Sequence, residues 1–187
     1  MCDAYFFGYG SLVNTLTHGY DPVFRATARN WRRAWRYTPD RSVAYLTAIR
    51  APGHSIDGLI APVPAEGWAT LDLREAAYDR LPAGHEVHHE AQASDIAIYA
   101  IDPARLHRPD DDHPVLMSYL DVVLQGYLRV FGEAGAQDFI DTTDGWDAPI
   151  LDDRSDPVYP RAQSLTRDER IFVRDALRAL DCKVLVR

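Results

Sequence analysis

Two glycines, Gly8 and Gly10, follow an aromatic segment close to the start of the chain. Residues 5–9 predict a buried strand that the glycines break into a tight turn. Glycine lets a backbone turn sharply, and successive N–H groups in such a turn bind an anion or a developing oxyanion. A dinucleotide-binding loop needs glycine or alanine where Val13 stands, and Ser11 lacks the Gly-x-Ser-x-Gly context of a nucleophile. The segment therefore predicts either a plain strand and turn or an anion cradle.

A second candidate for chemistry is the carboxylate of Glu75. The apolar residues around Leu71 have helical spacing, and Pro82 ends the segment. A carboxylate beside apolar residues on a short helix can be partly buried, and burial raises its pKa toward the range of a general acid or base. The competing and commoner arrangement is a solvated helix face with Arg74 and Glu75 pointing outward.

Residues 85–89 satisfy the HExxH pattern of zinc peptidases. That chemistry needs a helix, so that both histidines share one face and the glutamate acts as base. Pro82 lies just before the motif, and no apolar helical pattern surrounds it, which favours a polar strand or loop. A zinc hydrolase that uses His85, Glu86 and His89 is the alternative enzyme hypothesis.

Strands dominate the first hundred residues. Alternation and flanking turn residues predict strands over residues 24–37, 43–49, 58–63 and 96–101, with a turn at 51–54. The first of these carries four arginines among tryptophans, which predicts buried aromatics alternating with solvated arginines rather than an RNA-binding surface. The arginines are Arg29, Arg32, Arg33 and Arg36, and the tryptophans are Trp31 and Trp35.

Helices dominate the remainder. An apolar stripe from Val115 to Phe131 predicts a helix that bends or breaks at the glycines that follow it, and Thr166 with Glu169 predicts a capping box for a helix over 167–180. Residues 144–160 predict either a lid or a packed surface loop. The pattern predicts an α+β fold, with a small curled sheet or β-barrel, flanking helices and a C-terminal helical extension. We expect a domain over 1–135 and an extension over 136–187 packed on it.

Composition narrows the class of protein. The 187 residues are 47% hydrophobic and carry a formal net charge of −8, which predicts a globular chain and argues against a nucleic-acid partner. No apolar run is long enough to span a membrane, and the N-terminus lacks a signal-peptide pattern. Cys2 and Cys182 are expected to be reduced thiols. These features predict a cytoplasmic protein.

The order and spacing of several weak motifs resemble the gamma-glutamylcyclotransferase-like superfamily. Residues 6–12, Phe-Phe-Gly-Tyr-Gly-Ser-Leu, resemble its YGS loop. The segment 71–76 is similar to the one that carries its catalytic glutamate, in the Arg-Glu form of the glutathione-specific branch. Residues 113–119 are similar to the family's entry to a helix, whose tyrosine lines the site. The likeness covers residues 4–135.

The resemblance implies a cytoplasmic enzyme of glutathione metabolism, a transferase or lyase that releases 5-oxoproline from a gamma-glutamyl amine or amino acid. Glu75 would be the general acid and base. No metal or cofactor is implied, and the partner is the small-molecule substrate. A binding module that has lost turnover is a further alternative. The implied substrate-binding residues are Phe6, Phe7, Gly8, Tyr9, Gly10, Ser11, Leu12 and Tyr119.

Overall fold

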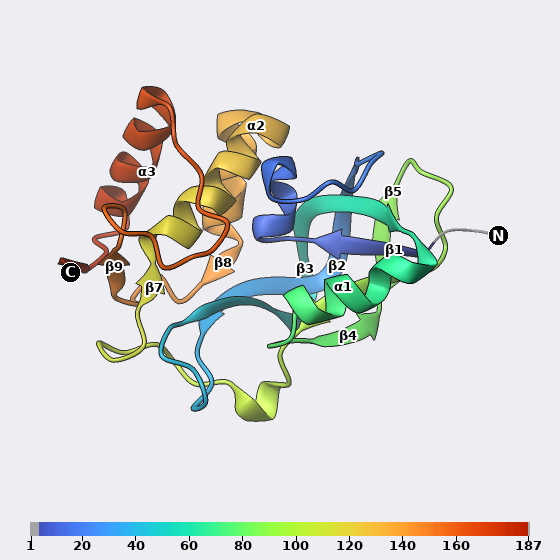
Figure 1. Cartoon of the computed structure of the whole chain (residues 1–187), viewed down its shortest axis with the longest axis horizontal. Coiled ribbons are helices and arrows are strands. Elements are labelled where there is room, and N and C mark those ends of the chain that lie inside the picture. The colour runs from blue at the N-terminus through green and yellow to red at the C-terminus, as the bar shows by residue number, and fades with distance from the viewer. Residues whose placement is uncertain (1–3, 187) are drawn as a thin grey trace.

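The structure is a computed structural model and describes residues 4–186 (Figure 1). A mixed sheet lies beside two long helices, and a smaller sheet joins the two ends of the C-terminal half. The strands are β1 (Ala4–Gly8), β2 (Phe24–Arg36), β3 (Tyr45–Val63), β4 (Asp79–Pro82), β5 (Val87–His89), β6 (Ile96–Ala100), β7 (Val115–Leu116), β8 (Thr143–Asp144), β9 (Ile150–Asp152) and β10 (Val184–Val186). The helices are α1 (Trp68–Arg74), α2 (Met117–Asp141) and α3 (Arg167–Ala179), with short 3-10 turns η1 (Ser11–Val13), η2 (Thr15–Thr17), η3 (Ala65–Gly67) and η4 (Pro103–Arg105).

The main sheet has the strand order β4-β6-β1-β3-β2-β5, with β8 added beside β2. Strand β1 runs parallel to β6 and antiparallel to β3, so it lies in the middle of the sheet. The end strands β4 and β5 pair with β6 and β2 and not with each other. The α+β class with flanking helices is confirmed, but the sheet is open, and the β-barrel alternative is wrong.

Strand β3 corrects the expected pair of strands at 43–49 and 58–63. Residues 45–63 form one strand that pairs with β2 on both sides of an irregularity. Arg29 pairs with Ser55 and Trp31 with Arg50, so residues 51–54 bulge out opposite Asn30 alone. The turn residues therefore do loop outward. The strand continues because β2 is long enough to hold both halves against the same partner.

Strand β2 corrects the expectation of solvated arginines at one position. Arg29 is exposed, but the Arg33 side chain is completely buried. Successive side chains of a strand alternate between its faces, so Arg33 shares the inner face with Trp31 and Trp35. The expectation of a solvated Arg33 is therefore wrong, because this residue lies on the same face of β2 as the two buried tryptophans.

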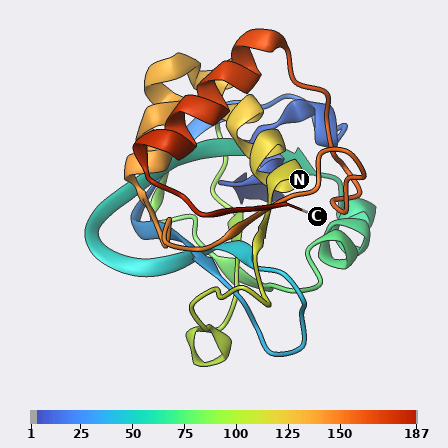
Figure 2. The same ribbon diagram turned by 90° about the vertical axis from the view of Figure 1, so that its left-hand side faces the viewer.

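The expected helices are confirmed. Helix α2 carries the apolar stripe and has a kink at Gly132, whose φ is +74°. Thr166 and Glu169 form the predicted capping box of α3. Helix α3 lies alongside α2 (Figure 2). Its Val173 and Leu177 are buried in the core cluster that also contains the apolar side chains of α2. No helix in the described part of the chain is long and apolar enough to cross a membrane. Cys2 lies outside the described residues.

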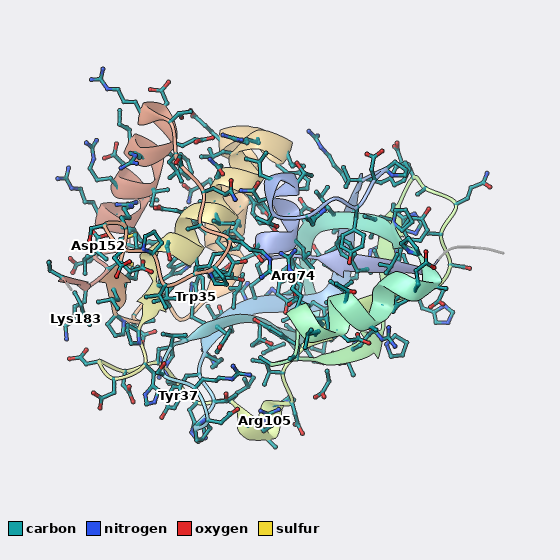
Figure 3. All side chains as sticks on the ribbon, in the orientation of Figure 1. Trp35, Tyr37, Arg74, Arg105, Asp152 and Lys183 are labelled. Carbon is teal, nitrogen blue, oxygen red and sulfur yellow. The ribbon has the colours of Figure 1, made fainter. Side chains whose placement is uncertain are left out.

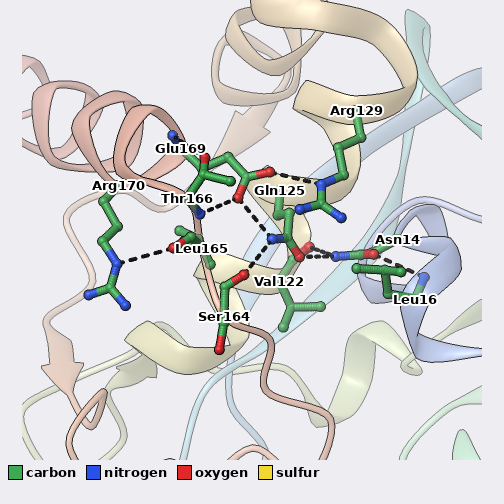
Figure 4. A network of polar contacts seen from close by, with 10 residues as sticks. All are labelled: Asn14, Leu16, Val122, Gln125, Arg129, Ser164, Leu165, Thr166, Glu169 and Arg170. Carbon is green, nitrogen blue, oxygen red and sulfur yellow. Dashed lines mark hydrogen bonds and ion pairs between the residues drawn. The ribbon is translucent and has the colours of Figure 1, made fainter.

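A polar network fastens the loop after β1 to both helices (Figure 4). The Gln125 side chain on α2 accepts a hydrogen bond from Asn14 Nδ2 at 2.9 Å and donates to Glu169 Oε2 at 2.9 Å. It also donates to the backbone oxygen of Ser164. Asn14 and Gln125 are almost fully buried, so each satisfied contact fixes the position of the loop. The β1 loop is thereby held on the side of α2.

Candidate active site

A pocket opens where the loop after β1, the end of α1 and the start of α2 meet. It is lined by Phe7, Gly8, Tyr9, Gly10, Ser11, Leu12, Leu46, Glu75, Tyr78, Tyr99 and Tyr119. The structure therefore brings together all the expected site residues except Phe6. The Phe6 side chain packs on the opposite face of β1 with Leu71 and Tyr99 in a separate apolar cluster. Alternation along β1 separates Phe6 from Phe7.

The first turn of the loop leaves backbone N–H groups without helical partners, and one of them, the Ser11 N–H, donates to the Tyr119 hydroxyl. In η1, the first backbone bond runs from Val13 N–H to the Gly10 carbonyl at 3.0 Å. The N–H groups that precede this bond have no helical acceptor. The carbonyl of Tyr9 accepts hydrogen bonds from Arg33 Nε at 3.2 Å and from the Tyr127 hydroxyl at 3.0 Å. In a trans peptide, N–H points opposite to C=O, so the Gly10 N–H points away from Arg33.

Glu75 lies one residue past the end of α1, where the chain turns toward the pocket. Its backbone N–H still donates to the Leu71 carbonyl, and its own carbonyl accepts from Tyr78 N–H, which places Glu75 and Tyr78 side by side. Only 15% of the Glu75 side chain is exposed. The outward-facing arrangement considered from the sequence is therefore wrong for this carboxylate.

Arg74, whose side chain is labelled in Figure 3, joins the glutamate to the glycine loop. Its Nε lies 3.1 Å from Glu75 Oε1, and its other nitrogens donate to Ser11 Oγ and to Thr17. Burial raises the pKa of Glu75, whereas the charges of Arg74 and Arg161 act in the opposite direction. Because burial dominates, Glu75 releases its proton less readily than an exposed glutamate and can both accept and return one.

The raised pKa of Glu75 predicts a pH-dependent effect on stability. A carboxyl group with a raised folded-state pKa stabilises the fold fully below its unfolded pKa, about 4.3. That contribution is lost as the pH rises through the folded-state pKa. We therefore expect Glu75→Gln to gain free energy of unfolding relative to wild type as the pH rises from 4 to 8. Urea denaturation across this range measures the difference, and the exposed Glu133→Gln variant is the control. A constant difference between wild type and Glu75→Gln would contradict the prediction.

Four tyrosines surround the carboxylate. Burial raises the pKa of both Tyr78 and Tyr119 well above the usual tyrosine value, so both hydroxyls stay protonated. The Tyr78 hydroxyl donates to the Leu46 carbonyl, and Tyr9 donates to the Tyr99 carbonyl. No described residue accepts a hydrogen bond from Tyr119, which leaves its proton available inside the pocket.

Tyr78, Tyr99 and Leu46 were not expected in the site. Tyr78 follows Glu75 by three residues. The only local signal for its place in the site was the turn after the short helix, which brings Tyr78 back toward Glu75. Tyr99 reaches the pocket from β6, and Leu46 from β3, so their contribution depends on strand pairing across the sheet. No local pattern in the sequence reports that pairing.

Gly10 is a position where the pocket has no space for a side chain. A Cβ on Gly10 would lie 2.8 Å from the Tyr119 hydroxyl oxygen. We therefore expect Gly10→Ala to displace Tyr119 and to lower turnover by about tenfold or more, because misplacement by 1 Å can cost a factor of a hundred. Steady-state kinetics would show this. Gly19→Ala is the control, since no atom lies within 4 Å of its added Cβ. Equal losses of turnover in Gly10→Ala and Gly19→Ala would contradict the assignment of Gly10 to the active site.

The HExxH segment does not form a metal site. Val87–His89 is strand β5, so the two histidines of the motif do not share a helix face. The Glu86 carboxylate pairs with Arg50 and accepts a hydrogen bond from Trp31 Nε1 at 2.9 Å. Among residues 4–186, no group of three or more metal-ligating side chains is close enough to hold an ion. The geometry contradicts the zinc-hydrolase hypothesis.

Several solved structures share this architecture. A gamma-glutamyl cyclotransferase has a TM-score of 0.54 at 11% identity, and the match covers 92% of this chain and 99% of that one. An uncharacterized human protein has a TM-score of 0.56 at 11% identity, with 93% and 99% covered. YkqA from Bacillus subtilis has a TM-score of 0.55 at 15% identity over 76% of this chain. The chain spans 56% of the length of YkqA.

No protein-family description matches the sequence, and no curated protein matches it. At these identities, the structural matches show the fold. The fold implied by the sequence motifs is confirmed: the chain has the gamma-glutamyl cyclotransferase-like fold.

Proposed function

We propose that the protein is a gamma-glutamyl cyclotransferase that releases 5-oxoproline from a gamma-glutamyl amine or amino acid. The observation that carries the proposal is the largely buried Glu75 carboxylate, which lines the same pocket as the glycine loop. The shared fold with a gamma-glutamyl cyclotransferase supports it. Residues 7–12 and Tyr119 line the substrate side of this pocket.

The reaction needs one proton transfer and no added reactant. The substrate's own α-amine nitrogen attacks its γ-carbonyl carbon, which forms the C–N bond of the ring. Glu75 takes a proton from that nitrogen and delivers it to the leaving nitrogen as the original amide C–N bond breaks. The products are 5-oxoproline and the free amine or amino acid, so atoms and charge balance.

The loop and Tyr119 supply position and charge stabilisation. Backbone N–H groups of residues 8–11 hold the substrate carboxylate or the developing oxyanion, and Tyr119 donates a hydrogen bond to the substrate. Ring closure is intramolecular. Holding the flexible glutamyl chain with its amine next to its γ-carbonyl therefore supplies much of the rate acceleration. Ser11 belongs to the loop that holds the substrate and is not a nucleophile. Its hydroxyl contacts Arg74.

The test is release of 5-oxoproline. The full-length protein is incubated with gamma-glutamyl amino acids, a gamma-glutamylamine and glutathione, and 5-oxoproline is measured by liquid chromatography. Turnover of at least one class is expected. Thermal stabilisation by these compounds without any product would identify the binding module instead. If the protein shows no turnover and no thermal stabilisation with any of these compounds, the assignment of the pocket is overturned.

A further inference from the structure

A second, larger pocket lies directly beside the first. We call the first pocket the inner pocket and this one the outer pocket. The outer pocket has a cavity volume of about 100 Å³ and shares Ser11, Glu75, Tyr78 and Tyr119 with the inner pocket. Glu75 therefore stands at the boundary between the two. In the proposed reaction the scissile amide lies at Glu75, with the glutamyl group held by the loop on the inner side. The departing group must then occupy the outer pocket.

The outer pocket is suited to a large apolar group. Apart from the shared residues and two arginines, its lining consists of Val43, Ala44, Tyr45, Leu116 and Tyr159. The aromatic rings stand edge to face: Tyr45 against Tyr78 at 6.2 Å and Tyr119 against Tyr159 at 5.0 Å between ring centroids. A closed apolar cavity of about 150 Å³ holds benzene. The outer pocket, at about 100 Å³, is smaller but open at its mouth, so a branched or aromatic side chain can enter it without being fully enclosed.

The pocket also contains a cation that the first site does not use. Of its two arginines, Arg74 is occupied by Glu75, Ser11 and Thr17. No ion pair within residues 4–186 involves Arg161, which lines the outer pocket and whose charge lowers the pKa of Glu75. A guanidinium beside an apolar surface is the preferred partner of a carboxylate, because it donates two parallel hydrogen bonds.

The wall that carries Tyr159 and Arg161 is anchored to the start of α2. The buried carboxylate of Asp153 accepts hydrogen bonds from Ser118 N at 2.8 Å, Ser118 Oγ at 2.6 Å and Val158 N at 2.9 Å. The backbone N–H of Tyr159 donates to the same Ser118 hydroxyl. The segment next to Tyr119 is therefore packed in place, which favours the packed-loop interpretation of residues 144–160 over a lid.

We infer that the outer pocket binds the departing group as a large apolar amino acid, with its side chain among the tyrosines and its free carboxylate on Arg161. The inference rests on the proposed function and narrows its substrate class. In such a conjugate the carboxylate and the side chain are both attached to the carbon next to the leaving nitrogen. Both therefore lie in the pocket that begins at Glu75. A gamma-glutamylamine has no carboxylate for Arg161.

The kinetic test compares three conjugates that share the glutamyl group. We expect kcat/KM for gamma-glutamyl-L-phenylalanine to exceed that for gamma-glutamyl-phenethylamine, which lacks only the carboxylate, by about tenfold or more, as for a charge-assisted contact. It should also exceed that for gamma-glutamylglycine, which lacks the side chain. Arg161→Met should reduce the first ratio toward one, whereas the exposed Arg167→Met should leave it unchanged.

Equal turnover of the phenylalanine and phenethylamine conjugates by wild type would overturn the role of Arg161 while leaving the cyclotransferase function intact. Equal turnover of the phenylalanine and glycine conjugates would overturn the apolar pocket. If no conjugate yields 5-oxoproline, the proposed function fails, and a binding experiment with the unreactive N-acetyl-L-phenylalanine tests the outer pocket separately.

In that experiment, calorimetry should show that wild type binds N-acetyl-L-phenylalanine. Wild type should not bind N-acetyl-phenethylamine, and the Arg161→Met variant should not bind N-acetyl-L-phenylalanine. Equal binding in all three cases would overturn the inference.

Discussion

Glu75→Gln is expected to lower 5-oxoproline formation by about a hundredfold to ten thousandfold, the contribution of a positioned general acid and base. Glutamine has nearly the same shape and can still accept the hydrogen bond from Arg74 Nε, which lies 3.1 Å from the carboxylate. It cannot accept a proton from the substrate amine at neutral pH. The loss should therefore fall on kcat with little change in KM. Single-turnover measurements with a gamma-glutamyl amino acid separate the chemical step from binding.

Asp72→Asn is the matched control for this variant. Asp72 lies on α1, three residues before Glu75, where it accepts a hydrogen bond from the Tyr99 hydroxyl and pairs with Arg80 on the surface. Its carboxylate does not line the pocket. We expect turnover within a few-fold of wild type. Full activity in Glu75→Gln, or equal losses in both variants, would remove Glu75 from the proton transfer.

Local patterns were enough to predict the parts of the site that lie close together in the chain. Gly8 and Gly10 predict a turn by their residue type alone, and the structure shows why glycine is needed there: an added Cβ would lie 2.5 Å from Leu12 Cβ and 2.8 Å from the Tyr119 hydroxyl oxygen. Glu75 follows an amphipathic turn, which identified it as a candidate. Its burial could not be predicted, because the covering side chains of Tyr9 and Tyr119 come from the loop after β1 and from α2.

Errors arose where tertiary pairing outweighed a local signal. Residues 51–54 have the composition of a turn, yet β2 pairs with both flanking segments and makes them one strand. Leu73 belongs to the apolar helix pattern, yet it is 77% exposed because α1 ends one residue later. Arg33 has a charged side chain, yet strand parity places it in the core. The last case has a functional consequence.

Arg33 is a buried cation held by neutral oxygens. Its guanidinium donates to Thr142 Oγ1 at 2.6 Å, to the Tyr127 hydroxyl at 2.7 Å and to the carbonyls of Tyr9 and Asp57. It also lies 5.0 Å from the ring centre of Tyr127. The structure shows no ion pair for it within residues 4–186. It therefore supports the Tyr9–Gly10 peptide from behind the pocket, where no substrate reaches.

Arg33→Met is expected to lower the free energy of unfolding by about 2–4 kcal/mol. Methionine fills much of the space, but the carbonyls of Tyr9 and Asp57 then share one remaining side-chain donor, the Tyr127 hydroxyl, which can donate to only one of them. The other carbonyl and the Thr142 hydroxyl lose the Arg33 donor, and an unsatisfied buried group costs about 1–3 kcal/mol. The gain from no longer burying a charge offsets part of that loss. Urea denaturation measures the change, and Arg29→Met, at an exposed position of the same strand, should leave stability nearly unchanged.

The same variant is expected to lose turnover in the fraction that stays folded. The Tyr9 carbonyl then keeps only the Tyr127 hydroxyl as a side-chain donor, so the Tyr9–Gly10 peptide is held less firmly and its N–H is less well aimed into the pocket. Tyr127→Phe separates this effect from the loss of stability. Burial raises the pKa of Tyr127 to about 12, so its hydroxyl is protonated, and its one proton is shared between the carbonyls of Tyr9 at 3.0 Å and Asp57 at 2.7 Å. Removing that hydroxyl keeps Arg33 and should cause a smaller loss of both stability and kcat. If Arg33→Met keeps the kcat of wild type while folded, Arg33 stabilises the core without positioning the loop.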